Sequence, residues 1–340
     1  MRTALMWMTR IPAIREIVPL SIGVGVLASV LVAAALLGDL RRSWDLLGVL
    51  RWGFLAWLVP LAIVDHGLRY LRWEVLLNHV ASARIARLKS VLAFSAGSLL
   101  IFTPARAGEV AKSFYARHYF GVPVSSSAPI LIAERLGDFA VMSVMAMTGL
   151  LLLGDGTAIW AVVGVFAAFL VAVALGIALI DRVPRWPMAR LPIGSRLKSA
   201  LGLANRSRRL LLRPRTLRTN LGFGVSAWSV ESAIFFFSLA AAGATIEPRL
   251  LWVALAVFPL ASVLGSISFL PGGVGVTEGA LAALAVLIGD IPGEVAVLAA
   301  LLSRAAILGV VVLAGLVSSS VLARGTRPAR TADMPPAAAP

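Results

Sequence analysis

The chain contains no cysteine, which excludes a disulfide framework, thiolate catalysis and zinc sites with cysteine ligands. Histidine is almost as scarce. His66, His79 and His118 lack the spacing of a ligand motif, so we expect no metal ion and no cofactor. Charge is the third shortage, because only 14% of the residues are charged, against about 25% in soluble domains. A composition this poor in charge excludes an ordinary soluble domain.

Apolar residues are in excess instead. They make up 59% of the 340 residues, against about 45–50% in soluble domains, so a lipid bilayer is the expected solvent. A chain of this length holds roughly six to ten spans of about 20 residues each. Little length is left for a soluble catalytic domain, and we expect any function to be built within the membrane.

The net charge of +15 does not indicate nucleic-acid binding. The basic residues gather in short segments between apolar runs, where the positive-inside rule already places them on the cytoplasmic side. Segment 182–218 contains eleven basic residues and no acid, which predicts a cytoplasmic loop. The loop after residue 72 is assigned to the same side by Arg72, Arg84, Arg87 and Lys89. We also predict cytoplasmic termini at 1–16 and 323–340, the latter a disordered tail rich in Pro, Ala and Arg, and no nucleic-acid partner.

The apolar runs predict an all-α polytopic membrane protein with a transmembrane domain at 17–322. Each run of about 20 apolar residues is long enough to form one spanning helix. About six full transmembrane helices are expected, at 17–37, 52–72, 130–153, 157–180, 220–242 and 294–322.

Two further apolar segments are interrupted and predict broken re-entrant hairpins, at 90–120 and 250–289. Counting the crossings makes the two hairpins open to opposite faces of the membrane. Helix, broken hairpin and helix then recur in 52–153 and 220–322 with opposite senses. This order is typical of the inverted repeats associated with alternating access. The alternative is two unrelated helical hairpins that share Pro-Gly turns.

A short motif occurs twice, once in each predicted hairpin. Both copies consist of Gly-Ser, then Phe-x-Pro, then glycine and glutamate. The first copy runs from Gly97 to Glu109 and the second from Gly265 to Glu278. Proline and glycine interrupt helices, and backbone freed at membrane depth must line a cavity or be covered by protein. The predicted hairpin tips are Pro104, Gly108, Pro271, Gly272, Gly273 and Gly275.

Charged residues accompany both copies at matching distances. An arginine follows each glutamate by 26 residues (135 − 109 and 304 − 278), which places Arg135 and Arg304 on the next apolar segment. An acid precedes each proline by 39 residues (104 − 65) or 40 residues (271 − 231), at Asp65 and Glu231. The two halves therefore share charged positions as well as the order of their segments.

These motifs resemble the lysylphosphatidylglycerol synthase/flippase transmembrane family. The resemblance covers about residues 15–320 and is carried by TPARAGE at 103–109, AERLGD at 133–138 and LPGGVGVTE at 270–278. It implies an integral membrane domain that moves or handles lipids. Bifunctional members carry a soluble aminoacyltransferase domain after the membrane part. Nothing in this chain resembles that domain, so the synthase activity is not carried over.

A flippase takes a polar, usually phosphate-bearing headgroup through an apolar slab, where one isolated charge costs about 2.5–3.5 kcal/mol or more. Arginine binds phosphate oxygens with two parallel hydrogen bonds. The predicted phosphate ligands are therefore Arg106, Arg135 and Arg304. Helix N-termini that begin after the hairpin tips would add N–H groups for an anion.

Carboxylates at the same depth have three candidate roles: they balance the arginines, accept an amine headgroup, or take part in a proton-coupled step. The first candidates are Glu109, Glu134 and Glu278. Asp65, Asp138 and Glu231 come second. The alternative is that these acids and arginines form ion pairs that only hold helices together.

The sequence thus favours a lipid flippase or transporter of the bacterial inner membrane over an enzyme, and we expect no catalytic residues. Its partners would be membrane lipids, either anionic or aminoacylated phospholipids or a hopanoid or polyprenyl lipid, and a homo-oligomer stays open. One alternative is a membrane-embedded transferase in which Glu109 or Asp138 acts as a base on a lipid-linked donor. Another is a non-catalytic accessory protein of lipid or envelope biosynthesis that recruits partners through 182–218.

Overall fold

The computed structural model describes residues 48, 50–79, 86–102, 109–154, 160, 163–164, 213–268 and 270–325. All regular elements in this part of the chain are helices. Five of them are long and apolar enough to cross a membrane, which confirms an all-α polytopic membrane protein. The predicted span 17–37 and most of 157–180, of the loop 182–218 and of the C-terminal tail lie outside the described residues.

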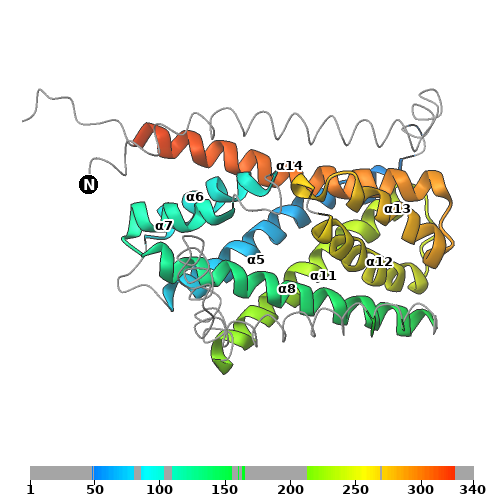
Figure 1. Ribbon diagram of the computed structural model, residues 1–340. Coiled ribbons are helices and arrows are strands. Elements are labelled where there is room, and N and C mark those ends of the chain that lie inside the picture. Colours follow the sequence, from blue (N-terminus) through cyan, green and yellow to red (C-terminus); the bar gives the residue numbers. More distant parts are fainter. Residues whose placement is uncertain are drawn as a thin grey trace, which may run out of the picture.

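Each half of the described chain contains a long helix, two shorter helices joined at a break, and a second long helix (Figure 1). The first half consists of α4 (Trp52–Leu55), α5 (Leu58–Asn78), α6 (Arg87–Ser98), the 3-10 turn η1 (Leu99–Phe102), α7 (Ala111–Phe120) and α8 (Val124–Leu153). The second half consists of α11 (Pro214–Ala241), α12 (Pro248–Ile267), the 3-10 turn η5 (Pro271–Gly273), α13 (Val276–Gly289) and α14 (Gly293–Gly325).

Local sequence determines several helix ends. Helices α11 and α12 begin at Pro214 and Pro248, because the fixed φ of proline suits the first helical turn and its missing N–H is not needed there. Helices α7 and α8 end at Gly121 and Gly154, whose φ values of 69° and 77° lie in the left-handed region that glycine adopts without strain.

Three predicted boundaries are wrong. The span predicted at 52–72 continues to Asn78, so Arg72 lies inside α5 and not in a cytoplasmic loop. The spans predicted to begin at 130 and 220 begin at Val124 and Pro214. In each case the sequence predicts that the span ends where polar or charged residues begin. These residues continue the helix instead, because their side chains either pair inside the protein or lie near the ends of the molecule.

Each predicted hairpin contains two helices that contact each other, α6 with α7 and α12 with α13. Helices α6 and α7 lie at one end of the molecule and α12 and α13 at the other (Figure 1). The breaks η1 and η5 contact each other between the two ends. One detail differs from the prediction, since α12 alone has 20 residues and by length and composition can cross a membrane.

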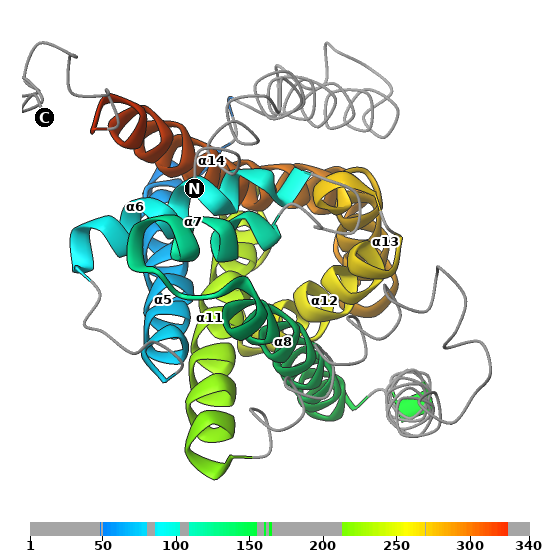
Figure 2. The same cartoon turned by 60° about the vertical axis from the view of Figure 1, so that its left-hand side comes forward.

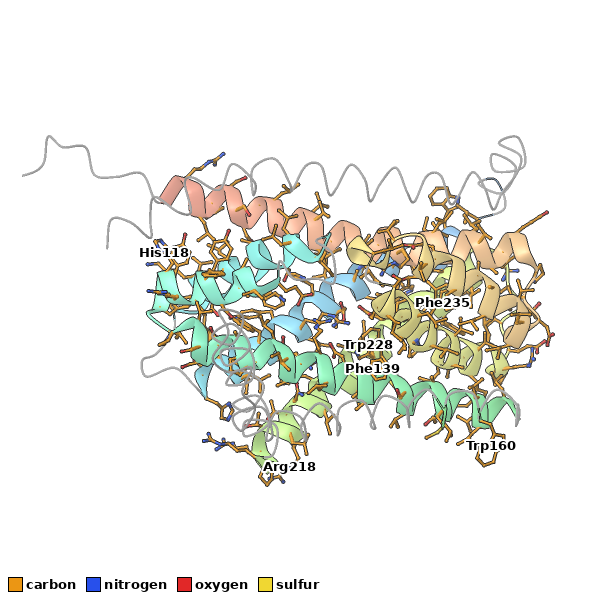
Figure 3. All side chains as sticks on the ribbon, viewed as in Figure 1. His118, Phe139, Trp160, Arg218, Trp228 and Phe235 are labelled. Atoms are coloured by element: carbon orange, nitrogen blue, oxygen red, sulfur yellow. The ribbon has the colours of Figure 1, made fainter. Side chains whose placement is uncertain are left out.

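The long helices pack across the two halves. Helix α5 packs against α11, α8 packs against α12, and α14 packs against α6, which lies beside it in Figures 1 and 2. The largest apolar core fills the second half around Phe235, Phe258 and Leu281. The outer surface is also apolar, as expected where lipid replaces water. Figure 3 shows His118 and Arg218 at one end of the molecule and Trp160 at the other.

The glycine that opens each copy of the repeated motif allows the two arms of a hairpin to approach closely. A Cβ atom on Gly97 would lie 2.6 Å from the Lys112 side chain across the first hairpin. A Cβ atom on Gly265 would overlap the Thr277 side chain across the second. The repeated glycine thus marks a point of close approach between the two arms of each hairpin.

Gly149 allows α8 and α12 to approach closely. We therefore expect Gly149→Ala to lower the free energy of unfolding by about 1–3 kcal/mol. The added Cβ would lie 2.6 Å from the backbone nitrogen of Ala256, which cannot move without shifting α12. Gly309→Ala is the matched control, because no atom lies within 4 Å of its added Cβ. Thermal unfolding in detergent should show a lower Tm for Gly149→Ala only. Equal Tm values would show that α8 and α12 are not in close contact at Gly149.

Candidate functional site

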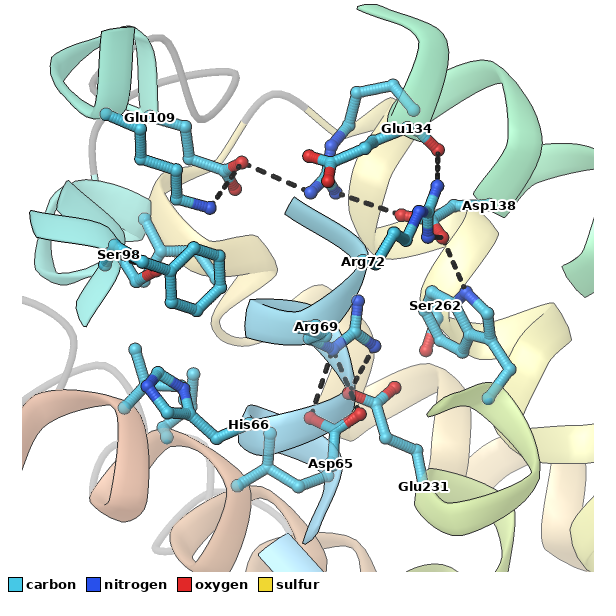
Figure 4. Close-up of a pocket in the computed structure, with 18 of the residues that line it drawn as sticks. Asp65, His66, Arg69, Arg72, Ser98, Glu109, Glu134, Asp138, Glu231 and Ser262 are labelled. Atoms are coloured by element: carbon cyan, nitrogen blue, oxygen red, sulfur yellow. Dashed lines mark hydrogen bonds and ion pairs between the residues drawn. The ribbon is translucent and has the colours of Figure 1, made fainter. Parts of the chain in front are cut away.

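A cavity of about 70 Å³ lies among the helices, well away from the ends of α5, α8 and α14 (Figure 4). This volume has room for several water molecules. Part of its wall is charged, with five acidic and five basic side chains from α5, α8, α11, α14 and the segment 109–112. Another part is apolar and includes Ile101, Ile307, Leu308 and Val311. We call it the central cavity.

Arg69 joins the two halves of the protein at the central cavity. Its Nε donates to both carboxylate oxygens of Asp65, each at 3.0 Å, and its Nη2 donates to Oε1 of Glu231 at 2.7 Å. The guanidinium also lies 5.1 Å from the ring centroid of Trp228, a cation–π distance. One arginine thus binds both Asp65 and Glu231. In the sequence these two acids correspond only in their distance from the proline of each motif copy.

Arg72 is the centre of a second network and is only 2% exposed. Its three nitrogens donate to different acceptors: Nη1 to Oδ1 of Asp138 at 2.5 Å, Nε to Oδ1 of Asn220 at 2.8 Å, and Nη2 to the backbone oxygen of Glu134 at 2.7 Å. The indole N–H of Trp228 donates to the same Asp138 oxygen at 3.2 Å. This network ties α5 and α11 to α8.

The arginine and glutamate of the first motif copy form an ion pair. Nη2 of Arg135 donates to Oε2 of Glu109 at 3.1 Å, and Nζ of Lys112 lies 3.6 Å from the same oxygen. Nη1 of Arg135 lies 3.7 Å from Oδ2 of Asp138, too far for a hydrogen bond. The Arg135 side chain remains 39% exposed, so part of its guanidinium is accessible from the central cavity.

The second motif copy forms the corresponding pair in a buried setting. Nε of Arg304 donates to Oε1 of Glu278 at 2.9 Å, and Nη2 donates to the backbone oxygen of Gly272 at 2.7 Å. Oε2 of Glu278 accepts the backbone N–H of Gly275 at 2.7 Å. The Arg304 side chain is 9% exposed and that of Glu278 is 1% exposed. This pair fixes the tip of the second hairpin to α14.

The tip of the second hairpin departs from the prediction in one respect. Gly272, Gly273 and Gly275 have φ values of 63°, 66° and 87°, so the glycines break the chain as expected. However, the N-terminus of α13 already holds an anion, because the carboxylate of Glu278 occupies it. The N–H of Gly275 is therefore not available to a ligand in this state.

Most of the predicted site residues come together. Asp65, Glu109, Glu134, Arg135, Asp138, Glu231 and Arg304 all line the central cavity, whereas Glu278 lies behind Arg304 and does not. Arg106, Pro104 and Gly108 lie outside the described residues. Within the described residues, no group of three or more potential ligands could hold a metal ion.

Three residues at the central cavity are not part of the sequence motifs: Arg69, Arg72 and Trp228. A signal for the arginines was present, because Asp65, Arg69 and Arg72 follow the i, i+4, i+7 spacing of one helix face. An acid and two arginines in one stripe of an apolar helix must point into the protein. For Trp228, no comparable pattern exists in the sequence.

Comparison with known proteins identifies the chain. Residues 20–315 match the sequence profile of one family, described as the lysylphosphatidylglycerol synthase TM region. No curated protein and no solved structure matches the chain. The match covers well over half of the 340 residues and includes both hairpins and every residue of the central cavity. The chain therefore belongs to the lysylphosphatidylglycerol synthase transmembrane family.

Proposed function

We propose that this protein is a lipid flippase that moves a phosphate-bearing lipid, anionic or aminoacylated, between the leaflets of a bacterial inner membrane. Its family implies a membrane protein of lipid metabolism or of flippase type. The observation that carries the proposal is the central cavity, in which arginines from both halves lie beside an apolar wall. A phospholipid needs both surfaces, one for its headgroup and one for the start of its acyl chains.

Arg135 is the best phosphate ligand among these arginines. A guanidinium has five N–H donors, and Arg135 uses one of them in a hydrogen bond to Glu109. Its 39% exposure leaves the other donors within reach of a headgroup in the cavity. Arg304, in contrast, donates two hydrogen bonds, one to Glu278 and one to the backbone oxygen of Gly272. We therefore assign phosphate binding in this state to Arg135.

The arrangement of the two halves supports alternating access. Helix α8 of the first half packs against α12 of the second, and the equivalent helix α14 of the second half packs against α6 of the first. Helices α5 and α11, which are equivalent to each other, also pack together. The hairpins enter from opposite ends and meet at η1 and η5 (Figure 1). These relations support the proposal of an inverted repeat, whose halves would exchange conformations around a site between them. The end with α6 and α7 is the cytoplasmic one in this proposal, because Arg117 and Arg218 lie there.

The transferase alternative receives less support from the geometry. A carboxylate that acts as a base needs an accessible, unpaired oxygen that can reach the substrate proton. Glu109 is 6% exposed and paired with Arg135 and Lys112, while Asp138 is 2% exposed and paired with Arg72. Both carboxylates neutralise neighbouring cations, and their burial leaves little access for a substrate hydroxyl.

The test is leaflet exchange of fluorescent phospholipids in proteoliposomes. The intact protein should move an anionic phospholipid, and Arg135→Ala should slow this movement about 10- to 100-fold, because a hydrogen bond to a charged group contributes about 1.5–3 kcal/mol. Arg218→Ala is the matched control, since Arg218 is exposed and its side chain hydrogen-bonds to the backbone oxygen of Pro214 on its own helix. The absence of exchange by the intact protein, for both anionic and zwitterionic lipids, would reject the flippase.

A further inference from the structure

Glu134 differs from the other acids of the central cavity. Asp65 and Glu231 pair with Arg69, Asp138 pairs with Arg72, and Glu109 pairs with Arg135 and Lys112. The carboxylate of Glu134 lines the cavity at 5% exposure and forms no hydrogen bond or ion pair with any described residue. Its backbone oxygen accepts a hydrogen bond from Nη2 of Arg72.

Asp138 supplies a second, independent observation. Its Oδ1 accepts hydrogen bonds from Arg72 and Trp228, but its Oδ2 is fully buried and has no hydrogen-bond partner among the described residues. Glu134 and Asp138 lie four residues apart on α8, so their side chains leave the same face of the helix one turn apart. An unpaired carboxyl group and an unused acceptor oxygen therefore lie next to each other.

A single proton satisfies both groups. A carboxylate that is only 5% exposed and has no hydrogen-bond or ion-pair partner among the described residues is disfavoured, whereas a protonated carboxyl group is neutral and has one O–H donor. That donor needs an acceptor, and Oδ2 of Asp138 is an unused acceptor one turn away on the same helix face. From this geometry we infer that Glu134 and Asp138 together hold one exchangeable proton, which crosses the membrane with the lipid. This inference rests on the proposed flippase function.

The site also suggests why lipid and proton should bind together. A phosphate that enters at Arg135 competes with Glu109 and Asp138 for the same guanidinium. The carboxylates that it displaces lose a counterion in a buried place, and the proton held by Glu134 and Asp138 offsets the added negative charge. The coupling requires that the empty site releases this proton before it crosses back, so that each lipid is accompanied by one proton. One phosphodiester carries one negative charge, so lipid and proton together carry none.

Other ionisable groups surround the acid pair and set its charge balance. Arg72, Lys112 and Arg135 are the positive charges that act on Glu134 most strongly. The complete set around the pair is Asp65, His66, Arg69 and Arg72 from α5, Glu109 and Lys112 at the start of the second hairpin arm, Arg135 from α8, Glu231 from α11 and Arg304 from α14.

The experiment measures how labelled phosphatidylglycerol distributes between the leaflets of proteoliposomes under an imposed pH difference. With one proton per lipid, the leaflet ratio should shift about tenfold per pH unit, towards the alkaline side, because one unit corresponds to about 1.4 kcal/mol. The shift should not depend on membrane potential. Glu134→Gln keeps the shape but cannot release a proton, so the lipid should still equilibrate while the pH-driven shift is lost.

Glu247→Gln is the matched control, since Glu247 is an exposed acid ahead of α12 and outside the central cavity. It should retain the full shift. Lipid movement without any effect of pH would overturn the coupling and leave the flippase intact. A shift of the same size in Glu134→Gln would overturn the assignment to this acid, and no lipid movement at all would overturn both proposals.

A second measurement does not depend on transport. Infrared spectra of the intact protein in detergent at neutral pH should contain the C=O stretch of a buried protonated carboxyl group. This band should be absent in Glu134→Gln and present in Glu247→Gln. Identical bands in all three proteins would show that Glu134 does not carry the proton.

Discussion

Arg72→Met is expected to destabilise the protein by about 3–5 kcal/mol, the cost of removing one partner of a buried ion pair. The guanidinium is 2% exposed and donates to Asp138, Asn220 and the backbone oxygen of Glu134. Methionine has a similar length but no donor. Asp138 would keep only the Trp228 hydrogen bond, and the oxygens of Asn220 and Glu134 would lose their partner.

The destabilisation would be measured by thermal or denaturant unfolding in detergent. The double variant Arg72→Met, Asp138→Asn removes both charges and should recover a large part of the loss, because the main cost of the single variant is an uncompensated charge. Arg218→Met is the control for removal of an exposed arginine and should leave stability nearly unchanged. A double variant no more stable than Arg72→Met would mean that the lost hydrogen bonds, and not the charge, determine the effect.

Much of the fold could be predicted because apolar length and helix-breaking residues have direct structural consequences. The break at Pro271 to Gly275 is visible in the sequence, since only glycine adopts the positive φ values found there without strain. The ends of α5 and α11 could not be predicted in the same way. The sequence predicts that Arg72 and the arginines near Pro214 lie in loops, because a sequence does not show that a charge has a partner on another helix.

The candidate site was predictable where the two halves repeat each other. The spacing of 26 residues selected Arg135 with Glu109 and Arg304 with Glu278, and both pairs form. Arg69 has no such counterpart, because the residue equivalent to it on α11 is Phe235 when Asp65 is aligned with Glu231. A sequence repeat identifies charged residues that both halves share, and it misses a residue that only one half contains. The repeat also does not predict how deeply each ion pair is buried, and the two pairs differ in this.

This difference in burial leads to unequal expected coupling energies for two pairs with the same spacing. A double-mutant cycle on Arg304 and Glu278 should give a coupling of about 1.5–3 kcal/mol or more, because both side chains are nearly inaccessible and share the hairpin tip. The cycle on Arg135 and Glu109 should give about 0.2–1 kcal/mol, since water reaches the arginine. Unfolding of the four variants of each pair provides both values.

The difference between the two coupling energies also tests whether the two halves of the protein occupy different states, as alternating access requires. Arg304 fixes its hairpin tip through Gly272, whereas Arg135 keeps donors for a ligand. If a phosphate binds at Arg135, a short-chain anionic phospholipid should reduce the coupling between Arg135 and Glu109 and leave that between Arg304 and Glu278 unchanged, because the ligand replaces only the accessible partner. Equal couplings without lipid would indicate that the two pairs are equivalent and that neither one is reserved for a headgroup.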